Sequence, residues 1–211
     1  MYQRYIKRIL DFSVALVGLL ALSPILLLLC ILGAVFLRGN PFFLQARPGR
    51  DEKLFSIVKF RTMTTAQGAD GKPLADSERL TAYGKFLRKV SLDELPELWN
   101  VLVGDMALVG PRPLLTQYLP YYTQEERRRH DVRPGITGLA QINGRNCLRW
   151  DERFRKDIEY VENIRFLGDI RILFQTVARV FSASGVQIDS AQEEGNLKEI
   201  RSAKRAVGVK E

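Results

Sequence analysis

An uncharged apolar run near the start of the chain limits the fold more than any other feature of the sequence. It extends over the twenty-six residues from Phe12 to Leu37. As a straight helix, this run would be about 39 Å long, enough to cross a hydrocarbon core of about 30 Å. It is too long for a signal peptide, and no small-residue cleavage pattern follows it before Arg38. The sequence therefore predicts a retained membrane segment.

Two features of this segment compete with simple crossing. Pro24 lies at its middle and removes the hydrogen bond to the carbonyl of Leu20, while Ser23 can satisfy freed backbone groups locally. Positive residues flank both ends, which by the positive-inside rule places both ends in the cytoplasm. From the residues alone, a kinked spanning helix and a helix-break-helix that re-enters one leaflet stay equal alternatives. The flanking cations are Arg4, Lys7 and Arg8 before the run, and Arg38, Arg47, Arg50 and Lys53 after it.

The composition narrows the chemistry that the rest of the chain can carry. A chain of 211 residues, 27% of them charged, is long enough for one globular domain with one attached element. The net charge of +8 indicates an acidic partner, and charge alone does not choose among nucleic acid, anionic lipid and a phosphorylated substrate. Cys30, Cys147 and the single histidine, His130, show no disulfide or zinc spacing. Carboxylates are therefore expected to carry the chemistry.

Beyond Arg38, the pattern predicts a small mixed domain. Residues 53–63 alternate as a strand does, and residues 65–78 are typical of a loop. Apolar residues recur at helical spacing in two later stretches, and the second could lie at a membrane surface or face the core. The tail, 190–211, is expected to be extended or loosely ordered. The first stripe is Leu92, Leu95, Leu98 or Trp99, and Leu102; the second is Phe166, Ile170, Leu173 or Phe174, Val177 and Phe181.

The most informative segment is VSLDELPELWNVLVGDMALVGPRP, residues 90–113. In one interpretation Ser91 caps a helix and Glu94 closes a capping box. In the other, Pro96 takes an early helical position, and Asp93 and Glu94 lie at a helix N-terminus that can hold a phosphate. Adjacent helical residues point about 100° apart, so the two carboxylates would have separate roles.

Two further segments carry turn chemistry. In the GPRP segment at 110–113, two prolines hold Arg112 on a stiff turn, which suits bidentate phosphate binding as well as a surface turn with a solvated arginine. In RRRHDVRPGITGLAQINGRN, residues 127–146, the glycines permit close approach by a ligand. Its first three arginines are expected to be solvated or to face lipid, and Arg145 and Asn146 to read a sugar or base edge or to form a simple loop.

Taken together, these blocks resemble the bacterial monotopic phosphoglycosyl transferases, most of all the small form that begins N-glycan assembly in Campylobacter-like bacteria. The matching blocks cover nearly the whole chain and occur in the family's order. They are the Ser23-Pro24 break, ARPG at 46–49, VKFRTM at 58–63, SLDELPELWNVLVGDM at 91–106, GPRP at 110–113 and RHDVRPGITGLAQINGRN at 129–146.

The resemblance implies a mostly helical α+β fold in three parts. These are a re-entrant membrane anchor at 1–38, a catalytic domain at 39–189 with amphipathic interfacial helices and a short sheet, and the tail at 190–211. It also implies the cytoplasmic face of the bacterial inner membrane. The expected partners are a UDP-sugar, polyprenyl phosphate and membrane lipid rather than nucleic acid, and a homo-oligomer stays open.

The resemblance also implies a reaction and a site. A sugar phosphate passes from the UDP-sugar, favoured to be an N-acetylated amino sugar, to polyprenyl phosphate, and UMP leaves. Asp93 is the implied nucleophile, with Glu94 beside it, and both are the expected ligands of a Mg²⁺ ion. Arg112 would bind phosphate, and Lys59, Arg88 and Asp157 would complete the polar site.

Two other classes of function remain open at this point. A membrane-bound glycosyltransferase would pass only the sugar and release UDP. A non-catalytic basic membrane module would need no metal and would tolerate the loss of Asp93.

Overall fold

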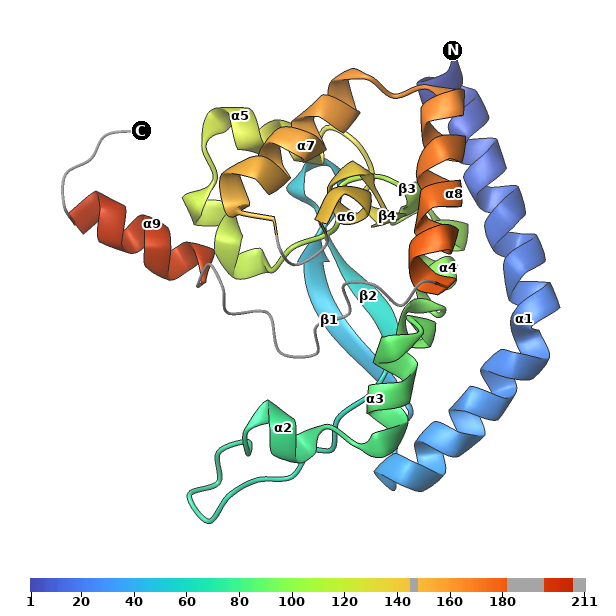
Figure 1. Ribbon diagram of the computed structural model, residues 1–211, viewed down its shortest axis with the longest axis vertical. Coiled ribbons are helices and arrows are strands. Elements are labelled where there is room, and N and C mark those ends of the chain that lie inside the picture. The colour runs from blue at the N-terminus through green and yellow to red at the C-terminus, as the bar shows by residue number, and fades with distance from the viewer. Residues whose placement is uncertain (145–147, 182–195, 207–211) are drawn as a thin grey trace.

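The computed structural model describes residues 1–144, 148–181 and 196–206. The fold is mostly helical, with one long apolar helix along one side and two small sheets within the globular part (Figure 1). The helices are α1 (Lys7–Leu37), α2 (Asp76–Arg79), α3 (Ala82–Lys89), α4 (Glu97–Val103), α5 (Gln124–Arg127), α6 (Leu139–Gly144), α7 (Trp150–Glu162), α8 (Phe166–Phe181) and α9 (Leu197–Ala206). The strands are β1 (Phe42–Pro48), β2 (Leu54–Phe60), β3 (Ala107–Val109) and β4 (Gly135–Thr137).

Helix α1 is continuous through Pro24. The hydroxyl of Ser23 donates to the carbonyl oxygen of Leu20 at 2.8 Å, which satisfies the carbonyl that Pro24 leaves without its helical donor. Figure 1 shows α1 changing direction near its middle. The prediction of two helices separated by a break is therefore wrong in form, because a bend replaces the break. Within the described residues, the helical stretch Tyr2–Leu37 is the one long and apolar enough to cross a membrane.

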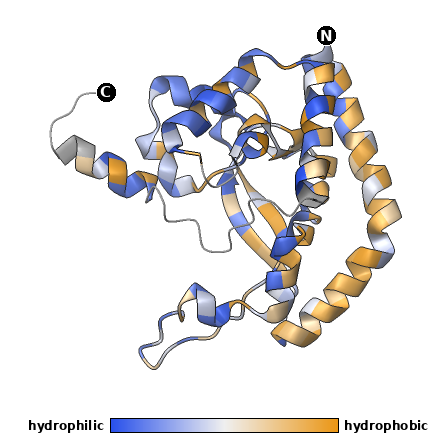
Figure 2. Cartoon of the chain, in the orientation of Figure 1, coloured by the Kyte–Doolittle hydropathy of each residue, from blue (hydrophilic) through white to orange (hydrophobic). Residues whose placement is uncertain are grey.

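Both halves of α1 contact the globular part. In the first half, the guanidinium of Arg8 donates to the carbonyl oxygens of Val101 and Leu102 at 2.6 and 2.9 Å. In the second half, the hydroxyl of Tyr83 donates to the carbonyl oxygen of Leu29 at 2.8 Å. The opposite side of the helix is exposed and apolar along its length (Figure 2).

The two sheets place short loops close to one another. Strands β1 and β2 form an antiparallel hairpin in which Phe42 pairs with Phe60, and β2 confirms the predicted strand. Strands β3 and β4 are parallel and bring residues 110–113 beside residues 135–138. The predicted loop at 65–78 is confirmed up to Asp76, where α2 begins.

The two predicted apolar stripes differ in their surroundings. The first is divided between a 3-10 turn, Leu92–Glu94, and α4, and its alternative member Trp99 is exposed. The second lies on α8, where Asp169 and Ile172 are buried against the domain. Most of the predicted stripe lies on the other side of α8, so the helix presents an apolar face outward. The large exposed residues on that face are Phe166, Leu167, Phe174 and Val177.

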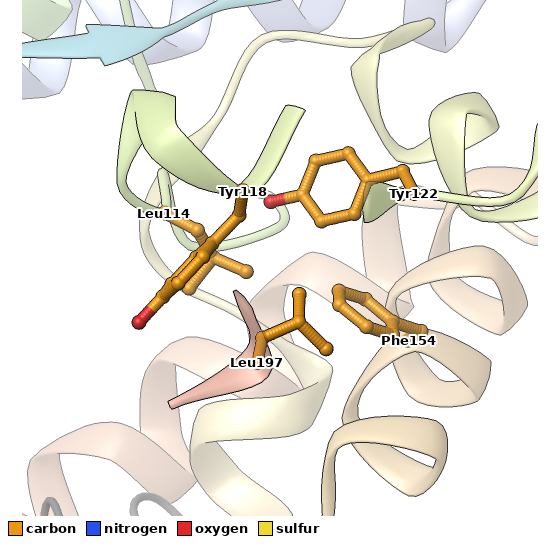
Figure 3. Close-up of a cluster of buried hydrophobic side chains, with 5 residues drawn as sticks. All are labelled: Leu114, Tyr118, Tyr122, Phe154 and Leu197. Atoms are coloured by element: carbon orange, nitrogen blue, oxygen red, sulfur yellow. The ribbon is translucent and has the colours of Figure 1, made fainter. Parts of the chain in front are cut away.

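The C-terminal part of the chain is more ordered than its composition indicates. Residues 197–206 form α9, and Leu197 is buried in a cluster with Tyr118 and Phe154 (Figure 3). The guanidinium of Arg201 forms hydrogen bonds of 2.6 and 2.7 Å with the carboxylate of Glu126. The prediction of a loosely ordered tail is therefore wrong for this stretch, because one apolar and one charged anchor attach it to the domain.

Candidate active site

The Asp93-Glu94 pair lies on a tight turn that precedes α4. Leu92–Glu94 forms a 3-10 turn, and Ser91 before it has left-handed backbone angles, with φ at 57°. Such angles are strained for a residue with a side chain, and strain of this kind clusters at functional sites. Ser91 makes no capping hydrogen bond, so the interpretation of this segment as a capping box is wrong. Pro96 is the N-cap of α4, close to its predicted early position, and both carboxylates precede the helix.

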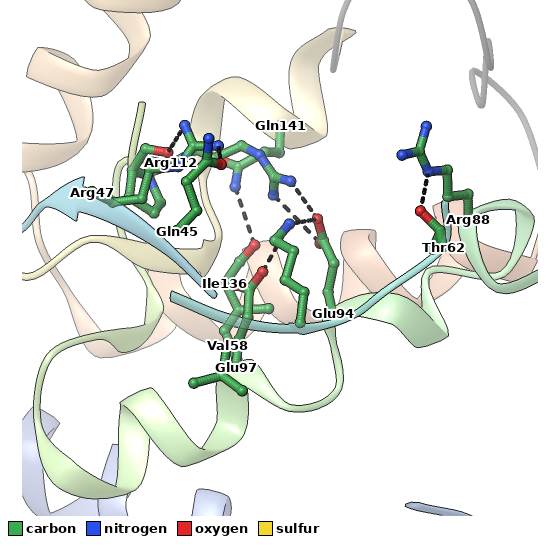
Figure 4. Close-up of polar contacts among 12 residues, drawn as sticks. Gln45, Arg47, Val58, Thr62, Arg88, Glu94, Glu97, Arg112, Ile136 and Gln141 are labelled. Atoms are coloured by element: carbon green, nitrogen blue, oxygen red, sulfur yellow. Dashed lines mark hydrogen bonds and ion pairs between the residues drawn. The ribbon is translucent and has the colours of Figure 1, made fainter. Parts of the chain in front are cut away.

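Glu94 is held by two cations. Its Oε1 atom accepts from the ammonium of Lys59 at 2.7 Å and from the guanidinium of Arg112 (Figure 4). Burial alone would raise the pKa of Glu94, but the charges of Arg112 and Lys59 outweigh it and hold this pKa well below its usual range. Glu94 is therefore ionised and fixed, with Oε2 making only a long contact of 3.4 Å to Arg112.

Asp93, by contrast, makes no hydrogen bond or ion pair with any residue that the structure describes. It lines a cleft of about 1180 Å³ together with Lys59, Arg88 and Arg112. Burial, and then the negative charge of Glu94, raise the pKa of Asp93 above its ordinary value. Two adjacent carboxylates thus have different environments, one neutralised by cations and one open toward the cleft, as their separate directions on the chain predict.

Glu97 is a member of this cluster that the sequence pattern did not single out. Its side chain is 1% exposed, and Oε1 lies 3.0 Å from the ammonium of Lys59. Burial, and then the charge of Glu94, raise its pKa to about 7. Its position three residues after Glu94, with the buried Val101 one turn further on, is a signal that could have indicated a glutamate on the inner side of the helix.

Arg112 is positioned through its backbone. The guanidinium of Arg129 donates to the carbonyl oxygen of Arg112 at 2.8 Å and to Asp157 at 2.7 Å. Asp157, predicted to bind substrate, lines the same cleft and forms this buried ion pair with Arg129. The prediction that the arginines at 127–129 are solvated or lipid-facing is wrong for Arg129, which is 2% exposed, because its guanidinium pairs with Asp157 and binds the backbone of Arg112.

The glycines after Arg133 serve the same loop. The backbone N–H of Gly135 donates to the carbonyl oxygen of Pro111, and that of Gly110 donates to Thr137. A Cβ on Gly138 would lie 2.1 Å from the carbonyl oxygen of Gly110, so only glycine fits there. These glycines therefore allow the chain itself to approach closely, where a ligand was expected.

The remaining predicted residues have separate places. Arg88, at the end of α3, donates to the hydroxyl of Thr62 at 3.1 Å and lines the cleft on the other side of Glu94 from Arg112 (Figure 4). Arg145 and Asn146 lie outside the described residues. Lys59 comes from β2 and lies at the centre of the cluster.

The donor set of the pair is compatible with Mg²⁺. No group of three or more histidine, cysteine, aspartate or glutamate side chains in the described part of the chain is arranged to hold a metal. Mg²⁺ usually needs only one or two carboxylates and completes its shell with phosphates and water. The free carboxylate of Asp93 and the Oε2 atom of Glu94 supply such a pair.

Comparison with known proteins places the chain in a family. The sequence profile described as bacterial sugar transferase matches residues 2–183. The chain is 48% identical over 183 residues to the uncharacterized sugar transferase EpsL of Bacillus subtilis, covering 86% of this chain and 90% of EpsL.

Two longer relatives have names that state an activity. The UDP-glucose:undecaprenyl-phosphate glucose-1-phosphate transferase of Klebsiella pneumoniae is 39% identical over 185 residues, covering 83% of this chain and 40% of the relative. The undecaprenyl-phosphate galactose phosphotransferase of Salmonella typhimurium is 37% identical over 200 residues, covering 86% and 42%. With a profile that covers most of its length and a relative matched almost end to end, this chain belongs to the bacterial sugar transferase family.

Proposed function

We propose that the chain transfers a sugar phosphate from a UDP-sugar to undecaprenyl phosphate and releases UMP, through a covalent intermediate on Asp93. The observation that carries the proposal is the contrast within the pair, in which Asp93 is free in a basic cleft while Glu94 is bound by Lys59 and Arg112. The names of the Klebsiella and Salmonella relatives support the general reaction.

The chemistry consists of two displacements at one phosphorus. An oxygen of Asp93 bonds to the phosphorus that carries the sugar, and the bond from this phosphorus to the oxygen of UMP breaks, with the electron pair leaving on UMP. An oxygen of the lipid phosphate then attacks the same phosphorus, and the bond to Asp93 breaks. The carboxylate is regenerated, and the product is a polyprenyl diphosphate sugar.

Each step joins two anions, so the surrounding cations have a defined task. Arg112 and Lys59 lie beside the nucleophile and can neutralise charge on the transferred group. Glu94 holds both cations in place, which is a role that Asp93 cannot share. A Mg²⁺ ion held by Asp93 and Glu94 would supply further charge neutralisation on the phosphates.

We further propose that α1 enters and leaves the same leaflet, with the domain on the cytoplasmic face. Contacts from both halves of α1 to one globular part support this, since a crossing helix would carry α3 and α4 into hydrocarbon, where polar backbone and side chains are costly. The exposed apolar faces of α1 and α8 would then lie in the lipid.

The sugar of the donor can be identified by screening UDP-sugars. The resemblance favours an N-acetylated amino sugar, whereas the two relatives are named for glucose and galactose. UMP release measured with each UDP-sugar in turn identifies the donor. Release of UDP in place of UMP would support the glycosyltransferase alternative.

The covalent step is tested without the acceptor. Enzyme, Mg²⁺ and the UDP-sugar should release up to one UMP per site, and mass spectrometry should find a phospho-sugar on Asp93. Asp93→Asn should abolish both the adduct and turnover, while Glu94→Gln keeps the nucleophile and should still form some adduct. Normal turnover by Asp93→Asn, or donor cleavage only when both substrates are present, would replace this mechanism with direct displacement.

A further inference from the structure

Arg47 is a further cation in the cleft, with no role in the steps of the proposed reaction. It comes from β1, in the ARPG segment, and lies near Arg112 (Figure 4). Both arginines line the cleft that Asp93 also lines. Its guanidinium donates to the side-chain oxygen of Gln45 at 2.6 Å and, at 3.4 Å, to the carbonyl oxygen of Pro113. Both acceptors are neutral, and Arg47 pairs with no carboxylate of the described chain.

Burying the guanidinium of Arg47 without a carboxylate costs free energy, which indicates that an anionic ligand binds it. The Nε atom of Arg47 is buried without a hydrogen-bond partner, and an unpaired buried donor costs the full desolvation of that group. Burial, and then the nearby charge of Arg112, lower the pKa of Arg47. By comparison, the buried Arg129 and Arg201 each face a carboxylate.

Gln141 lines the same cleft and carries a second unpartnered atom. Its side-chain nitrogen donates to the carbonyl oxygen of Ile136 at 3.2 Å, which fixes the orientation of the amide. The oxygen of this amide is buried and accepts no hydrogen bond within the described residues. It therefore suits a ligand that brings a hydroxyl or an N–H group.

We propose that Arg47, Arg112 and Gln141 form the subsite for the UDP-sugar, with Arg47 binding a phosphate and Gln141 accepting from a hydroxyl or N–H of the same molecule. The inference rests on the proposed function and assigns one of its two substrates to one side of the cleft. The combination of a cation, Arg47, with an unfilled acceptor, the Gln141 oxygen, distinguishes the UDP-sugar from the lipid phosphate. A UDP-sugar carries phosphates, hydroxyls and a uracil N–H, whereas the polyprenyl part of the lipid phosphate offers no such donor.

The test separates the two substrates. In a ping-pong reaction, kcat/KM for each substrate reports its own half-reaction. Arg47→Gln should lower kcat/KM for the UDP-sugar by about 10- to 100-fold, the value of a lost hydrogen bond to a charged group, and leave that for polyprenyl phosphate unchanged. Arg47→Lys keeps the charge and loses the planar fork, so it should recover part of the loss. Arg50→Gln, an exposed arginine two residues beyond β1, is the matched control and should change neither value.

Binding gives a readout that needs no turnover. Calorimetry should show that Arg47→Gln weakens binding of UMP and of inorganic diphosphate, whereas Gln141→Met weakens binding of UMP alone. Unchanged donor kcat/KM and unchanged UMP affinity in Arg47→Gln would overturn the subsite, as would a loss confined to polyprenyl phosphate, which would give Arg47 to the lipid. If wild-type protein binds UMP through Arg47 but releases none from any UDP-sugar, the subsite stands and the proposed reaction fails.

Discussion

At the scale of single residues, neighbours in the sequence have different chemistry because of what surrounds them. Asp93 and Glu94 differ by one methylene, yet Lys59 and Arg112 lower the pKa of Glu94 while burial raises that of Asp93. The raised pKa of Asp93 leaves its carboxylate less stabilised and so better suited to attack. The proposal that Asp93 is the nucleophile therefore rests on where these two cations lie.

Glu97 gives the protein a pH-dependent stability. Its folded pKa of about 7 is above its ordinary value of 4.5, so the folded protein holds this proton more tightly than the unfolded chain. The resulting stabilisation is complete below the ordinary value and is lost as pH rises through about 7. Denaturant unfolding in detergent should show the free energy of unfolding falling over this range, and Glu97→Gln should flatten the fall.

The matched control for this measurement is Glu125→Gln, which removes an exposed carboxylate and should keep the wild-type slope. Equal slopes for wild type and Glu97→Gln would show that Glu97 titrates as it does in the unfolded chain.

At the scale of elements, α1 shows how one proline changes direction without ending a helix. Ser23 satisfies the carbonyl that Pro24 frees, so the backbone stays paired in an apolar surrounding. The bend lets both halves of the helix follow the same domain, with Arg8 anchoring one half and Leu29 the other. A polar cap beside a proline thus makes a bend compatible with lipid.

The proposed re-entrant topology can be tested at this bend. Cysteines at Gln3 and Asn40, in an otherwise cysteine-free protein, should both be shielded from a periplasmic thiol reagent. Ser23→Leu with Pro24→Leu removes the proline and the serine that cause the bend, so it should straighten the helix and shift the protein toward spanning, with one site labelled. Leu27→Val with Leu28→Val is the control and should leave both shielded. Labelling of one site in the otherwise native segment would establish a crossing helix.

At the scale of the whole molecule, the end of the chain closes the core beside the GPRP loop. Leu197 of α9 is 1% exposed and packs with Leu114 and Tyr118, which follow Pro113. Helix α9 lies beyond residue 183, where the family profile ends. An element outside the shared sequence therefore helps to support a loop of the candidate site.

The contribution of α9 can be measured by truncation of one side chain. Leu197→Ala should lower the free energy of unfolding by about 2 to 5 kcal/mol, the range for a large buried side chain replaced by alanine. Lys198→Ala, on the exposed side of the same helix, should change it little. Urea unfolding of both variants in detergent gives the comparison, and equal values would mean that Leu197 does not pack in the folded protein.

The sequence by itself determined the parts that depend on local pattern and composition. The length of the uncharged run predicted the long apolar helix, and the alternation in residues 53–63 predicted β2. The order of the motifs predicted the family and the candidate site. Only the tertiary structure decided which groups meet. Arg129 and Glu97 look like surface charges until distant segments enclose them, and Asp157 is a partner of Arg129 because α7 packs there. The physical reason is that periodicity describes a residue's neighbours along the chain, whereas burial and charge pairing depend on residues far away in sequence.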